Sequence, residues 1–74
     1  MPYDYSKLLG KIVEEFGTQY RFAEAIGLSE HTTSLKLNGK IGWKQAEIEK
    51  ACEALKIDRS EMHDYFFALK VQNS

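Results

Sequence analysis

The stretch at residues 18–39, TQYRFAEAIGLSEHTTSLKLNG, decides the fold of this chain. Gly27 can adopt the positive φ that ends a helix sharply, and Ser29 can cap the next helix by accepting a hydrogen bond from a backbone N–H. Ala23 is small where two helices must cross closely, and Gly39 is a stop signal after the second of them. These residues predict two short helices joined by a turn of about three or four residues, the layout of a helix-turn-helix.

The segments on either side also carry helical patterns. Asp4 is expected to cap a helix that ends at Phe16, and Trp43 introduces a further helix after a loop at residues 39–42. A last helix opens with Asp58 and Glu61 as a pair like a capping box. The first helix is expected to bury one stripe, made of Tyr5, Leu8, Leu9, Ile12, Val13 and Phe16. The later inward faces are Ile48, Ala51 or Cys52, and Leu55, then Met62, Tyr65, Phe66 and Leu69.

The C-terminal tail, residues 67–74, has two interpretations. Phe67, Leu69 and Val71 alternate with more polar residues, which is the period of a strand. An extended tail would pair edge to edge with a second copy and form a dimer interface. Alternatively, the aromatic residues before it close the core of a monomer and the last residues fray.

Length and composition define the class of protein. The chain has 74 residues, of which 43% are hydrophobic, so we expect a single all-α domain over residues 1–74, a compact five-helix bundle. One cysteine, expected on the inner face of its helix, allows no internal disulfide, and no Cys/His cluster has zinc-ligand spacing. No signal peptide and no apolar run of roughly 20 residues is present, which favours a cytoplasmic protein without membrane contact.

Several motifs resemble one known family. Gln19 at the start of a helix, the turn at residues 27–29 and the run at residues 38–40 have the spacing of bacteriophage repressor and Cro-like helix-turn-helix domains, often called XRE-like. The resemblance covers residues 5–55. A narrower likeness, in residues 34–40, 43–45 and 65–67, is to short phage-encoded regulators. The resemblance implies the phage-repressor fold and binding to duplex DNA.

The helix at residues 30–38 departs from this family in two places. Family members usually have apolar core side chains at the positions of Thr33 and Lys36. Leu37 is expected to take over the core contact, while the Lys36 stem lies along the edge and its ammonium reaches solvent or phosphate. Leu35 either packs on a thymine methyl group in the major groove or belongs to the core.

The resemblance implies a DNA site built on this helix. The expected base contacts come from Glu30, His31, Ser34 and Leu35. The expected phosphate contacts come from Thr18, Gln19, Ser29, Thr32, Lys36, Asn38, Lys40 and Lys44. Trp43 either fills a gap in the core or places its indole N–H on a phosphate.

The leading hypothesis is a sequence-specific transcriptional regulator, a repressor or Cro-like protein that binds an inverted-repeat operator as a homodimer. The net charge of −1 argues against a nonspecific DNA coat protein. The alternative is a helix-turn-helix module that binds another regulator or a polymerase subunit, as the low charge and Leu35 suggest. No paired carboxylates, nucleophile elbow or glycine-rich phosphate loop is present, so we expect no enzyme, cofactor, metal or small-molecule ligand.

Overall fold

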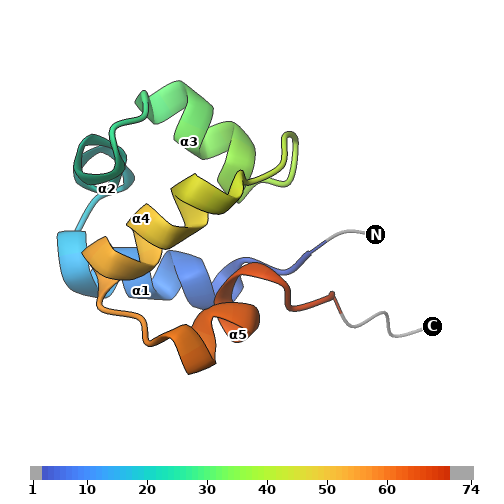
Figure 1. Ribbon diagram of the computed structural model, residues 1–74. Coiled ribbons are helices and arrows are strands. Elements are labelled where there is room, and N and C mark those ends of the chain that lie inside the picture. Colours follow the sequence, from blue (N-terminus) through green and yellow to red (C-terminus); the bar gives the residue numbers. More distant parts are fainter. Residues whose placement is uncertain (1–2, 71–74) are drawn as a thin grey trace.

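The computed structural model describes residues 3–70 and is all-helical (Figure 1). The helices are α1 (Ser6–Phe16), α2 (Gln19–Ile26), α3 (Glu30–Leu37), α4 (Gln45–Leu55) and α5 (Met62–Phe66), with a 3₁₀ turn, η1 (Arg59–Glu61), before the last. Figure 1 shows α4 between α3 and α1, with α5 beside α1. This confirms the expected compact five-helix fold.

The boundaries of α2 and α3 follow the predicted caps. Thr18 Oγ1 accepts a hydrogen bond from the Arg21 N–H at 3.2 Å, and Ser29 Oγ accepts one from the Thr32 N–H at 3.1 Å. Gly27 has φ of 76°, and its N–H donates to the last carbonyls of α2. Glycine adopts this left-handed conformation at lower cost than other residues, so Gly27 ends α2 sharply.

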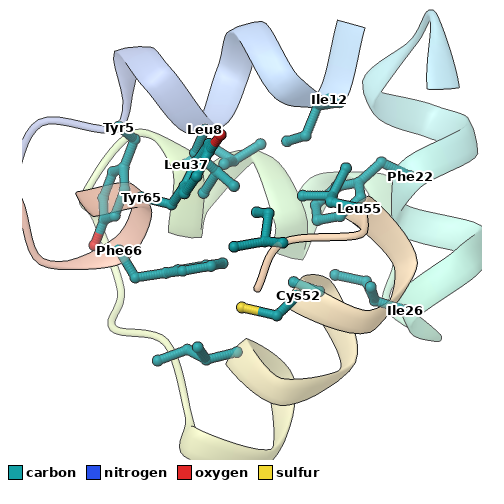
Figure 2. Close-up of a cluster of buried hydrophobic side chains, with 13 residues drawn as sticks. Tyr5, Leu8, Ile12, Phe22, Ile26, Leu37, Cys52, Leu55, Tyr65 and Phe66 are labelled. Atoms are coloured by element: carbon teal, nitrogen blue, oxygen red, sulfur yellow. The ribbon is translucent and has the colours of Figure 1, made fainter. Parts of the chain in front are cut away.

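The core lies where the five helices converge (Figure 2). Phe22, Leu55 and Phe66 are almost fully buried there, and Cys52 has its sulfur within the same cluster. Burial raises the pKa of the Cys52 thiol, which keeps it neutral, as expected for a structural cysteine. The remaining members are Tyr5, Leu8, Ile12, Ile26, Leu37, Ile48, Ala51, Ile57 and Tyr65.

The predicted stripe of α1 was too wide. Leu8 and Ile12 are buried, but Leu9 is 39% exposed and Val13 63% exposed. Both lie one position after a buried residue, so they are rotated by about 100° from it. The neighbouring helices cover only one face of α1, and an apolar residue on the next face stays in contact with solvent.

The C-terminal region differs from the predicted helix. The capping box at Asp58 does not form: the Asp58 carboxylate accepts a hydrogen bond from Ser60 Oγ, and the Glu61 N–H donates to the Asp58 backbone carbonyl. The final helix ends at Phe66, so Leu69 is not an inward helical residue; it is 51% exposed and forms an antiparallel bridge with Tyr3 of the same chain. The described part of the tail is therefore not helical and makes one isolated bridge within the same chain, and Val71 lies outside the described residues.

We predict that Phe22→Ala lowers the free energy of unfolding by about 3–5 kcal/mol, because it removes a fully buried ring and leaves a cavity. The matched variant Val13→Ala changes it by less than about 0.5 kcal/mol, because that side chain is largely solvated. Urea titrations measure both. An equally large loss in Val13→Ala would show that α1 buries a different face.

Candidate functional site

The four predicted base-reading residues on α3 differ in their exposure to solvent. Glu30 and His31 are exposed, whereas Ser34 and Leu35 are half-buried. Ser34 also accepts hydrogen bonds from the Asn38 side-chain amide, at its carbonyl oxygen (2.8 Å) and its hydroxyl (3.2 Å). Leu35 is thus neither fully buried in the core nor fully exposed, so it matches neither of the two predicted environments.

Lys36 differs most from expectation. Its side chain is buried, and the ammonium lies 2.9 Å from Glu47 Oε1 and donates a hydrogen bond of 2.8 Å to the Gly42 carbonyl oxygen. The Trp43 ring centroid is 5.9 Å away, close enough for a cation–π contact. The ammonium was expected to reach solvent or phosphate, but it forms an ion pair with Glu47 inside the protein.

Glu47 is the acidic partner that the sequence reasoning missed. Its carboxylate also accepts a hydrogen bond from the backbone N–H of Lys44 at 2.8 Å, at the start of α4. Burial alone raises the pKa of Glu47, but the hydrogen bonds from Lys36 and Lys44 and the charges of both lysines outweigh it. The net result is a pKa below the ordinary value of 4.5.

The other predicted phosphate contacts are mostly engaged in local structure. Thr18 and Ser29 serve as helix caps, and Ser29 Oγ also donates to the Thr32 hydroxyl at 2.9 Å. Gln19 and Thr32 are half-buried, while Asn38, Lys40 and Lys44 are exposed. Of the three lysines proposed to contact phosphate, Lys40 and Lys44 thus keep a solvent-facing position.

Trp43 joins the α3–α4 loop to the C-terminal helix. Its ring packs edge-on against Phe66, with centroids 5.2 Å apart. The indole Nε1 is buried and has no hydrogen-bond partner within residues 3–70. The structure therefore places Trp43 against the core, with its indole N–H shielded from solvent.

An exposed apolar surface lies where the two ends of the described chain meet. We call it the terminal patch and define it as Tyr3, Phe67 and Leu69, which are 40%, 37% and 51% exposed. The Asp4 N–H donates to the Ala68 carbonyl at 2.7 Å beside the bridge, and the Tyr3 and Phe67 rings pack edge to face, 6.0 Å apart. Two predicted dimer residues thus gather with Tyr3, which a strand pattern in the tail alone could not reveal.

Residues 3–70 hold no group of three or more metal-ligating side chains. No helix of this region combines the length and the hydropathy that a bilayer crossing demands.

We predict that Lys36→Ala lowers the free energy of unfolding by about 3 kcal/mol at neutral pH, because it leaves the Glu47 carboxylate without its partner. A group with a depressed folded pKa stabilises above its unfolded pKa, and this stabilisation is lost as the pH falls through the folded pKa. Below pH 4.5 the wild-type protein therefore loses stability, and the difference between the two proteins shrinks as Glu47 protonates.

Urea titrations at neutral and acid pH measure this difference. Lys50→Ala, at an exposed position of the same helix as Glu47, is the control and should cost less than about 0.5 kcal/mol at both pH values. A Lys36→Ala cost that does not depend on pH would contradict the role of the ion pair.

Comparisons with known proteins show what this chain is similar to. The solution structure of the modulator of repression (MOR) of the temperate bacteriophage TP901-1 from Lactococcus lactis is 57% identical, with a TM-score of 0.80 over 97% of each chain. This supports the narrower resemblance to short phage regulators, whereas membership of the broader repressor and Cro-like family is not confirmed. The curated proteins gave no match. A family model matches residues 1–69, and the chain therefore belongs to the family described as "Protein of unknown function (DUF739)".

Proposed function

We propose that this protein is a phage regulator that acts by binding a repressor protein, the alternative that the sequence already raised. The observation that carries the proposal is its 57% identity, over 97% of both chains, to a modulator of repression. A protein that modulates repression needs a surface for the repressor or for the operator. The arrangement of charge and apolar area in this chain favours the first.

The charges on the α3 side fit duplex DNA poorly. Lys36, a predicted phosphate contact, is paired with Glu47, and Glu30 places an exposed carboxylate on the first turn of α3. Most affinity for DNA comes from neutralising phosphates with free cations. The loss of one cation and the presence of an acid on this helix weaken the DNA hypothesis.

The terminal patch is the surface that best fits a protein partner. Contiguous exposed apolar side chains mark interaction sites in small soluble domains, and aromatic residues are enriched at the centres of protein interfaces. Tyr3, Phe67 and Leu69 surround a shallow hollow of about 720 Å³ that His63, Asp64 and Ala68 complete. Polar groups at the rim of an apolar centre are the usual arrangement of such a site.

We predict that the protein binds the purified repressor of bacteriophage TP901-1 and that Phe67→Ser weakens this binding at least about tenfold, as loss of a central aromatic residue does. The matched control is Tyr20→Ser, because Tyr20 is 53% exposed but lies on α2 outside the terminal patch. Calorimetric titration measures the dissociation constants, and unfolding curves check that both variants fold. Equal binding by wild type and Phe67→Ser would show that the terminal patch is not part of the interface with the repressor.

Duplex-DNA binding is the second candidate, and the exposed Glu30 and His31 at the capped start of α3 favour it. Selection from a random duplex library tests it. Enrichment of an inverted repeat with half-sites about one helical turn apart would indicate a dimeric operator binder. Such enrichment without repressor binding would overturn the proposed function. A homodimer is required by the DNA hypothesis only, and both candidates place the protein in the cytoplasm of a bacterial host.

A further inference from the structure

A second hollow, which we call the lysine groove, lies between the α3–α4 loop and the terminal segments. Its volume is about 450 Å³, within the range of ligand-binding pockets. One wall is the loop at residues 38–43, and the other includes Tyr3, Phe67 and Lys70. Figure 1 shows this loop and both terminal segments on the same side of the molecule.

Hydrogen bonds to α3 hold the loop that forms one wall of the lysine groove. The Lys40 N–H donates to the Leu35 carbonyl oxygen at 2.8 Å, and the buried Lys36 ammonium donates to the Gly42 carbonyl oxygen at the same distance. Gly39 reverses the chain with φ of 72°. Because these contacts fix the loop before any partner arrives, binding in the groove would cost little ordering of the backbone.

The lining of the groove combines apolar surface with positive charge. Tyr3, Ile41, Trp43 and Phe67 contribute apolar side chains, and Ile41 is 42% exposed. The charged side chains of the lining are two lysines, Lys40 and Lys70, and none of the described lining residues is acidic. In a protein with a net charge of −1, this is a local reversal of sign.

Asp4 is the nearby acid that must be considered. It does not line the groove, and it is occupied by hydrogen bonds from the Ser6 side chain and backbone, which lower its pKa most. The charge of Lys70 lowers the pKa of Asp4 further, but by less than the hydrogen bonds do. Asp4 therefore offsets part of the charge of Lys70 but leaves Lys40 without a comparable neighbour in the groove.

We propose that the lysine groove binds an acidic peptide segment of the partner, in which an apolar or aromatic side chain enters between Trp43 and Phe67 and an adjacent carboxylate meets Lys40 and Lys70. Charge complementarity selects the carboxylate, and the apolar lining selects its neighbour. Tyr3 and Phe67 line both this groove and the hollow of the terminal patch, so the two surfaces are continuous. The inference rests on the proposed function, because it names the chemistry of the repressor segment that is bound.

A peptide selection tests this without the repressor. Short random peptides displayed on yeast are selected with the purified full-length protein, and the enriched peptides are expected to carry an apolar or aromatic residue next to Asp or Glu. Binding should shift the emission of Trp43, because it lines the groove and is the only tryptophan in the chain. A shift in Trp43 emission would therefore show that the peptide binds in the groove rather than at another surface.

The double variant Lys40→Glu with Lys70→Glu should weaken binding of the enriched peptides at least about tenfold. The matched control, Arg21→Glu with Lys50→Glu, reverses two exposed cations away from the groove and should stay within about twofold of wild type. Enriched peptides without acidic residues, equal weakening by both double variants, or an unchanged Trp43 signal would each overturn the inference. Repressor binding that persists in the groove variant would overturn the groove while leaving the proposed function intact.

Discussion

The buried ion pair between Lys36 and Glu47 fixes how α3, α4 and the loop between them fit together. An ammonium group inside a small protein is tolerated only when its charge and its donors are matched, and here a carboxylate and the Gly42 carbonyl oxygen match them. The pair joins the last turn of α3 to the first turn of α4 and holds the loop between them. Trp43 packs on Phe66, and this contact joins the loop to the C-terminal helix α5.

The ion pair also determines which charged side chains are available to bind a partner. In a DNA-reading protein, a lysine on α3 would be expected to reach toward phosphate, but here that lysine stabilises the interior. What remains exposed is an acidic first turn of α3, an apolar terminal patch and two lysines at an adjoining groove. A surface with apolar area and local charge of both signs is typical of protein interfaces, and the proposed function rests on this arrangement.

The success of sequence reasoning varied with the range of the interaction involved. Thr18, Gly27 and Ser29 were predicted correctly because a cap or a positive-φ turn depends on residues within one helical turn. Most of the core followed from helical periodicity. Val13 and Leu69 were assigned to the core wrongly, because periodicity shows which residues are apolar but not how wide a face the neighbouring elements cover. The role of Lys36 was missed since Glu47 is eleven residues away.

The sequence by itself determined the number and order of the helices and the turn between α2 and α3, because local backbone preferences and side-chain periodicity encode these features. Only the tertiary structure decided which cations are free, which apolar residues are exposed, and that Tyr3 meets Phe67 and Leu69. Those properties depend on burial and on contacts between residues far apart in the chain. The proposed interaction surfaces belong to this second group because they form only when the two ends of the domain come together.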